Sequence, residues 1–477
     1  MASSGPPESR RFVAPLAVSL LAIVVLGTTL VFGAFMLGLL VFSQSRLSAQ
    51  EPADGWTLED LVAVALDRNP GLAAARTAIS SAEEDIMAAK GERLPWVDAV
   101  GKSEIFPRRE RLLIFRHGFR GDDNPFETGI LNYGLEVTLP LYTSGRIEHG
   151  ISLAEARSEA VRARAELTRI GLMFNVASAY FTALQVQQVI AAQDAVLRSL
   201  RESQRIGELQ AQVGRIARLD LLKLETRVSE AERDLAGARN AYAQALAVLK
   251  ELINVPIEVS LNVAGELVPA PTGVALGALR DRALAQRPDL IALRHEVQAQ
   301  REAVGIATAR FGPSVGFRAS YGGATGIDDG ITKDDARLLL DVRIPLYEGG
   351  VLKARRRKEM ARLRVAELRL QEAERRALAE LERAALDLGA AEPRIRAARR
   401  AVDQASESLR VEREKFGQGR GTSNDLLLAE QALLRSRTEL AAAVADSQIA
   451  LAALKLAVGE DPVSVTAAPS VTGSGGG

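Results

Sequence analysis

Two hydrophobic periods alternate along the chain. Between residues 131 and 139 every second side chain is apolar: Leu131, Tyr133, Leu135, Val137 and Leu139. The same alternation occurs at 314–322 and 336–344, and more weakly at 97–105. A period of two predicts strands with one apolar face, which we expect at about 96–106, 131–141, 314–322 and 336–346. Each is close to the length that a tilted strand needs to cross a bilayer.

Long stretches with a helical period follow each pair of strands. Residues 146–213 contain no proline, and at about 1.5 Å per residue such a helix would reach about 100 Å. In 220–253 apolar residues recur at spacings of three and four, which is the seam of a coiled coil. The helices that we expect are 71–93, 146–213, 220–253, 289–310, 351–417 and 425–457.

The chain is an internal duplication. The segment around Pro140 recurs around Pro345, 205 positions later, and the same offset relates Asp220 to Asp425. Upstream, Pro95 matches Pro313 at an offset of 218, so the first copy carries 13 extra residues in a loop between its two strands. The organisation that follows is a signal peptide at 1–49, a first repeat at 50–260, a linker at 261–275, a second repeat at 276–462 and a disordered tail at 463–477.

The N-terminal segment has the pattern of an export signal. Arg10 and Arg11 precede an apolar run at 12–42, and Ala49 provides a small residue before an acidic start. We expect cleavage after residue 49. The run is also long enough to remain as an uncleaved membrane span, because about 20 apolar residues suffice.

Composition and charge exclude several functions. Lys and Arg number 60 and Asp and Glu number 60, so no basic surplus favours nucleic acid. The chain has no cysteine and only three distant histidines, which predicts no disulfide, metal site or other cofactor. No glycine-rich phosphate loop and no set of histidine, acid and nucleophile is visible, so we expect no enzyme.

The doubled motifs resemble the outer membrane efflux (TolC-like) family. The resemblance covers about 57–462, and its residues are Asn69-Pro70, Leu94-Pro95, Ala179-Tyr180, the paired Leu139-Pro140-Leu141-Tyr142 and Ile344-Pro345-Leu346-Tyr347, and the glycines Gly145, Gly350, Gly214 and Gly419. It implies a mostly α fold in a homotrimer. Long coiled-coil helices would form a periplasmic α-barrel, and four strands per chain would contribute to one transmembrane β-barrel in outer-membrane lipid.

The resemblance also implies a function. Such a protein is the exit duct of a tripartite efflux or type I secretion system of a Gram-negative bacterium. Its partners are a periplasmic adaptor protein and an inner-membrane transporter. The alternative is a structural coiled-coil protein held in the membrane by residues 12–42; the alternating strands argue against it, since a scaffold does not need them.

In the duct interpretation one face of the sheet lines the lumen. The polar positions of the strands predict its residues as Asn132, Glu136, Thr138, Arg318, Arg337, Asp341 and Arg343. The alternative is that they form the solvent-exposed face of a soluble sheet.

The turns between long and return helices are expected at the periplasmic tip. By the resemblance, Asp425, its repeat partner Asp220 and Leu428 would form the gate. A helix cap is the competing interpretation of Asp425, because it follows Thr422 at the start of a helix. The residues that resemble the adaptor-contacting tip are Val213, Gly214, Arg215, Gly419 and Arg420. In the second long helix, Pro393 predicts a bend.

Overall fold

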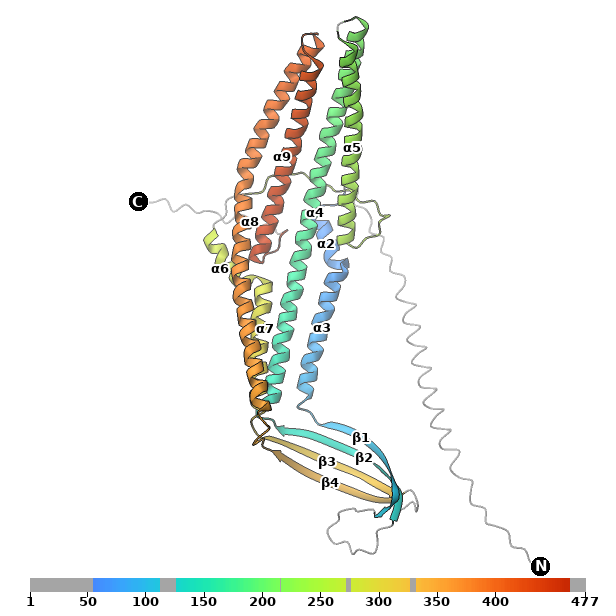
Figure 1. Cartoon of the computed structure of the whole chain (residues 1–477), viewed down its shortest axis with the longest axis vertical. Helices are drawn as coiled ribbons and strands as arrows, with labels where there is room; N and C mark the ends of the chain where they lie inside the picture. The colour runs from blue at the N-terminus through green and yellow to red at the C-terminus, as the bar shows by residue number, and fades with distance from the viewer. Residues whose placement is uncertain (1–54, 112–125, 215, 272–275, 327–331, 464–477) are drawn as a thin grey trace, which may run out of the picture. The chain divides into compact units, whose positions relative to one another are not determined.

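The computed structural model describes residues 55–111, 126–214, 216–271, 276–326 and 332–463. The expected signal peptide and residues 464–477 lie outside this part. The described chain is mostly helical and carries one four-stranded antiparallel sheet, as the fold class predicted (Figure 1).

The two repeats contain the same elements in the same order. The first has α2 (Leu58–Arg68), α3 (Pro70–Gly91), β1 (Trp96–Arg111), β2 (Phe126–Tyr142), α4 (Arg146–Gln212) and α5 (Arg218–Leu252). The second has α6 (Leu276–Gln286), α7 (Pro288–Ala309), β3 (Ser314–Gly326), β4 (Thr332–Arg343), α8 (Val351–Gly417) and α9 (Ser423–Val458).

Local sequence explains where the helices begin. Asn69 caps α3 by accepting a hydrogen bond from the Leu72 amide at 3.1 Å, and Pro70 occupies the first helical position, where no amide donor is needed. The two long helices each begin after a left-handed glycine, Gly145 with φ 87° and Gly350 with φ 81°. The repeat therefore extends to backbone conformation.

The helices form one layer, with the shorter ones stacked end to end beside the long ones. Near the sheet, α7 packs between α8 and α4, and α3 packs on the other side of α4; farther away, α9 and α5 take the same places (Figure 1). The Asn69 amide joins α3 to the end of α5 by donating to the Leu252 carbonyl at 2.9 Å. Arg287 joins α7 to α9 by donating to the Ala457 carbonyl at 3.3 Å. Two short helices thus match the length of one long helix.

Small side chains allow these helices to approach closely. The buried positions of α4 that face its neighbours near the sheet are largely alanine: Ala154, Ala156, Ala160, Ala163 and Ala165. Among the described helices, α9 is long and apolar enough to cross a bilayer, but it packs along α8 and α4. Its apolar surface therefore serves the core of the layer.

The strands are longer than the alternation predicted, with 16, 17, 13 and 12 residues in β1 to β4. Backbone pairing continues into polar sequence, because ladder hydrogen bonds do not require apolar side chains. At the other end β4 stops at Arg343, not at residue 346. Pro345 has no amide hydrogen to donate, and at its counterpart Pro140 the register of β2 shifts.

Two helix predictions also need correction. The return helices begin two residues before their predicted starts, at Arg218 and Ser423. In α9 this is because Thr422, and not a later residue, is the N-cap. α8 continues through Pro393 as one bowed helix (Figure 1), and the bend expected at Pro393 itself stays a prediction.

Candidate functional site

The strand register places all seven predicted lumen residues on one face of the sheet. Directly paired residues of antiparallel strands share a face. Glu136 pairs with Ser320, which pairs with Arg337, and Thr138 pairs with Arg318. The same parity assigns Asn132, Asp341 and Arg343 to this side, which we call the polar face.

The opposite side, the apolar face, carries the alternating hydrophobic residues. Its members include Val97, Tyr133, Leu135, Val137, Phe317, Tyr321, Leu338, Leu340 and Val342. Several are strongly exposed, and Leu338 reaches 79%. An exposed apolar surface of this extent on a sheet requires a cover of lipid or protein.

Ion pairs lie on the polar face. Arg318 Nε lies 2.8 Å from a carboxylate oxygen of Glu136 on the neighbouring strand, and Arg337 Nε lies 2.5 Å from Asp335 on its own strand. Lys102 and Glu104 of β1 form a further pair. The polar face is therefore charged but internally compensated, which suits contact with water.

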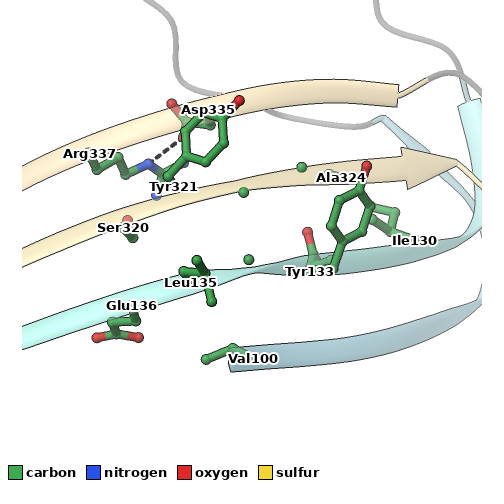
Figure 2. Close-up of a pocket in the computed structure, with 14 residues that line it drawn as sticks. Val100, Ile130, Tyr133, Leu135, Glu136, Ser320, Tyr321, Ala324, Asp335 and Arg337 are labelled. Atoms are coloured by element: carbon green, nitrogen blue, oxygen red, sulfur yellow. Dashed lines mark hydrogen bonds and ion pairs between the residues drawn. The ribbon is translucent and has the colours of Figure 1, made fainter. Parts of the chain in front are cut away.

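A row of glycines hollows the sheet at about its middle. Gly134 of β2 pairs with Gly322 of β3, and beside them lies a hollow of about 320 Å³, bordered by Val100, Asp335 and Arg337 (Figure 2). A Cβ atom on Gly134 would lie 2.8 Å from the Tyr321 carbonyl oxygen. The two strands therefore approach too closely here for any side chain, as expected where a sheet curves.

At the far end of the helices, hydrogen bonds tie the two hairpin turns together. Asp220 of α5 accepts a hydrogen bond from the Ser423 hydroxyl of α9 at 3.0 Å and is bonded to Lys223 at 3.1 Å. The bond from Lys223, with that from Ser423, holds the pKa of the Asp220 carboxyl below its ordinary value. Gln210 of α4 donates to the carbonyl of Phe416 in α8 at 2.9 Å.

Asp425 takes part in a helix cap. Its amide donates to the Thr422 hydroxyl oxygen at 3.1 Å, and that hydroxyl donates to the Asp425 carboxylate at 2.7 Å. The competing interpretation from sequence is thus realised, while the exposed carboxylate is still accessible to a further role. Leu428, one turn on, is 56% exposed.

The turns present exposed side chains. Val213 is 68% exposed, and the apolar neighbours Leu209 and Leu219 are also exposed. Gly214, Gly419 and Arg420 lie on the same turns and are exposed, whereas Arg215 lies outside the described residues. The turn between α4 and α5 therefore exposes three apolar side chains to solvent.

A buried polar cluster that no sequence pattern predicts lies among three helices. Glu430 of α9 is 1% exposed and contacts the Ser199 hydroxyl of α4 and the guanidinium of Arg413 in α8, the latter at 3.3 Å. Its other carboxylate oxygen has no partner among the described residues. Burial raises the pKa of Glu430, although Ser199 and Arg413 act in the opposite direction. These residues meet only because three helices pack together in one axial register, so no sequence motif predicts the cluster.

We expect Glu430→Gln to raise the Tm of the folded protein above pH 7. Because burial raises the pKa of Glu430, the ionised carboxylate costs stability in the folded state. The gain should shrink as the pH falls through the raised pKa and vanish below the ordinary value of 4.5, where the carboxyl is protonated in both states. Thermal unfolding from pH 4 to 8 measures it.

The matched control is Glu225→Gln, since Glu225 is the exposed counterpart of Glu430 in the first repeat. An equal change in Tm for the two variants, or a gain that grows at low pH, would contradict the cost assigned to burial.

The chain is similar in sequence to known proteins. The model of the "Outer membrane efflux protein" family matches residues 61–255 and 279–460, which is most of the chain and leaves out the linker. The alkaline protease secretion protein AprF of Pseudomonas aeruginosa is 28% identical over 396 residues, which cover 79% of this chain and 82% of AprF. The outer membrane efflux protein BepC of Brucella suis is 25% identical over 339 residues, 68% of this chain and 71% of BepC.

Solved structures share the fold. The outer-membrane channel OprN superposes with a TM-score of 0.74 at 20% identity, covering 85% of this chain and 90% of OprN. The outer membrane protein VceC of Vibrio cholerae gives a TM-score of 0.71 at 20% identity, covering 84% and 96%. At such identities the likeness concerns the arrangement of helices and strands.

Proposed function

Because the chain belongs to the outer membrane efflux protein family, we propose that it is the outer-membrane exit duct of a tripartite efflux or type I secretion system. Its relatives include the secretion protein AprF and the efflux protein BepC. The duct conducts its cargo passively from the periplasm to the exterior, and no catalytic step is involved.

The observation that carries this proposal is a sheet that cannot exist in a membrane alone. It has one apolar face, and within the described residues neither β1 nor β4 is paired along its outer side. Hydrocarbon provides no partner for backbone amides, so open edges must be closed. We infer that copies of the chain close it. By the family resemblance the copies number three, so that twelve strands form one barrel.

In this trimer the polar face lines the lumen. The residues in contact with cargo and water would be Asn132, Glu136, Thr138, Arg318, Arg337, Asp341 and Arg343. Their mixed charges support a wet conduit that is not dedicated to one sign of cargo. The apolar face would contact outer-membrane lipid.

The helices extend the duct through the periplasm. A periplasmic adaptor would dock on the turns through Val213, Gly214, Arg215, Gly419 and Arg420, and an inner-membrane transporter would load the cargo. The exposed apolar residues of these turns support a docking role.

We propose that Asp425 and Leu428 narrow the duct at the tip, with Asp220 beside them. Three carboxylates close to one axis would attract cations and neighbouring basic groups that hold the tip shut. Asp425→Ala should then raise the conductance of the purified protein in a planar bilayer several-fold.

Thr422→Ala is the control, because it removes the cap contact but keeps the carboxylate. An unchanged current in Asp425→Ala, or an equal increase in Thr422→Ala, would remove Asp425 from the gate. If neither the wild type nor either variant conducts in the bilayer, the duct itself is contradicted.

A further inference from the structure

The duplication is visible in how elements pair. The β1–β2 register is reproduced by β3–β4: the pair Trp96 and Thr138 becomes Ser314 and Arg343 at the offsets of 218 and 205 found in the sequence. The helix contacts α3–α4 and α4–α5 recur as α7–α8 and α8–α9. Most contacts of the first repeat thus have a counterpart in the second.

Among the contacts that lack such a counterpart within the chain, the three most extensive join the two repeats. β2 pairs with β3, and α4 packs on α7 and on α9. Their counterparts would be β4 with β1, α8 with α3 and α8 with α5. In the part of the chain that the structure describes, β4 and β1 are not paired, and α8 has no comparable contact with α3 or α5. Figure 1 shows these elements at opposite edges of the helical layer and of the sheet.

We propose that a second copy of the chain supplies the missing junctions in the same register, with side-chain sizes and charges redistributed so that the junction between copies differs from the one within the chain. This inference rests on the proposed assembly and adds the residues that specify it.

The strand junction follows from the offsets. Glu136 opposite Ser320 within the chain becomes Asp341 of one copy opposite Lys102 of the next. Both residues belong to the polar face, so the transferred register keeps the two faces of the sheet continuous. It also sets opposite charges directly across the junction, which stabilises a strand pair, whereas like charges would weaken it.

The helix junction shows an exchange of volume. Within the chain, His149 of α4 lies over Gly305 of α7, where a Cβ atom would come within 2.6 Å of the imidazole Nδ1. The counterparts at the junction between copies are Ala354 on α8 and Met87 on α3. At the counterpart junction the larger residue, Met87, is therefore on α3 and the smaller, Ala354, is on α8. Met87 is 63% exposed in the single chain.

The same exchange occurs where the helices meet the sheet. Ser144 donates a hydrogen bond to the Pro313 carbonyl at 2.6 Å, and its hydroxyl occupies the space that a Cβ on Gly312 would need. The counterparts are Gly349 for Ser144 and Leu94 for Gly312. Leu94 is 61% exposed. Two independent positions therefore place the larger residue on the α3 side and the smaller on the α8 side.

Charged groups, unlike the large side chains, keep their sides at the junction between copies. His149 Nδ1 lies 2.7 Å from the Glu302 carboxylate within the chain. The counterpart of Glu302 is Glu84 on α3, and the corresponding part of α8 carries the exposed cations Lys353, Arg357 and Lys358. A carboxylate from one copy would thus face cations of the next. Packing the wrong pair of helices together would leave cavities or overlaps, which disfavours misassembly.

Cysteine cross-linking in the full chain tests the register, because the natural sequence has no cysteine. Lys102→Cys with Asp341→Cys should form a disulfide between copies under oxidising conditions. The resulting covalent dimers and trimers should return to monomers when a thiol reductant cleaves the disulfide. Cβ atoms of directly opposed residues lie about 4.5–5.5 Å apart, and small adjustments bring them to disulfide distance. The control, Glu104→Cys with Asp341→Cys, lies on the same face one pair farther along and should cross-link at least tenfold less.

The volume exchange is tested by a rescue. Met87→Ala should lower the temperature at which the trimer dissociates in detergent, and adding Ala354→Met should restore at least half of that loss. Without such exchange across the junction, the second substitution would bring no recovery.

The outcomes separate this inference from the function on which it rests. A protein that is trimeric by native mass but cross-links in the control register, or not at all, overturns the inference and leaves the duct intact. A protein that stays monomeric in detergent and in membranes overturns both.

Discussion

Leu338→Arg is expected to abolish assembly of the protein into the outer membrane, whereas Leu339→Arg should assemble nearly as well as wild type. The two leucines are neighbours on β4, and both are exposed in the single chain, at 79% and 50%. They differ in the face that they occupy. Leu338 pairs with Ala319 on the apolar face, and Leu339 pairs with Arg318 on the polar face.

The physical reason is the cost of a charge in hydrocarbon. Arginine on the lipid side of a barrel near its midplane costs about 2–4 kcal/mol, and a trimer carries that cost three times. On the polar face the new guanidinium would remain in water, close to the Glu136 and Arg318 ion pair. The cost there should be small, because a solvated charge keeps its hydration.

The measurement is the amount of folded trimer in outer-membrane fractions, for the two variants expressed at equal levels. A soluble sheet would accept arginine equally well at both positions. Equal yields would therefore contradict the assignment of the apolar face to lipid.

Gly322→Ala is expected to give the second large effect, a severe loss of folded barrel. A Cβ at this position would overlap the Tyr133 carbonyl oxygen and would lie 2.7 Å from the Gly134 Cα on the adjacent strand. Both are backbone atoms, so no side-chain rotation can relieve the overlap. Separating the strands would cost about 1–3 kcal/mol or more per chain and would flatten the curvature that closure requires.

Gly316→Ala is the matched control. Gly316 lies on the same strand and the same face, and a Cβ there meets nothing within 4 Å. Refolding yield in detergent and the heat stability of the trimer compare the two. If Gly316→Ala were as damaging as Gly322→Ala, the loss would come from alanine anywhere in the strand. The close approach of the two backbones at Gly322 would then not explain it.

Much of the architecture was predictable because two features in the sequence repeat. Pro140 and Pro345, with the alternation before each, locate the strands that lead into the long helices. A period of two also fixes which residues share a face, and all seven residues assigned to the polar face do share it. The coiled-coil seam of the return helices was predictable in the same way, from apolar residues at spacings of three and four.

Other features depend on partners that sequence does not specify. The ends of the strands extend beyond the apolar alternation, because pairing in the hairpin continues through polar residues such as Thr325 and Thr332. The sequence is compatible with two roles of Asp425, a helix cap and a gate residue. The structure shows the cap contact with Thr422, and the gate stays a prediction. The Glu430 cluster needs the axial register of three helices, which no local pattern encodes.

The most direct test of the central claim is to separate inner and outer membranes on a sucrose gradient, from cells that make the protein, and to read the N-terminus of the recovered chain. An exit duct should be found at outer-membrane density, with a chain that begins near Gln50. Inner-membrane density with residues 1–49 intact would contradict the exit duct and would favour a coiled-coil scaffold anchored through residues 12–42.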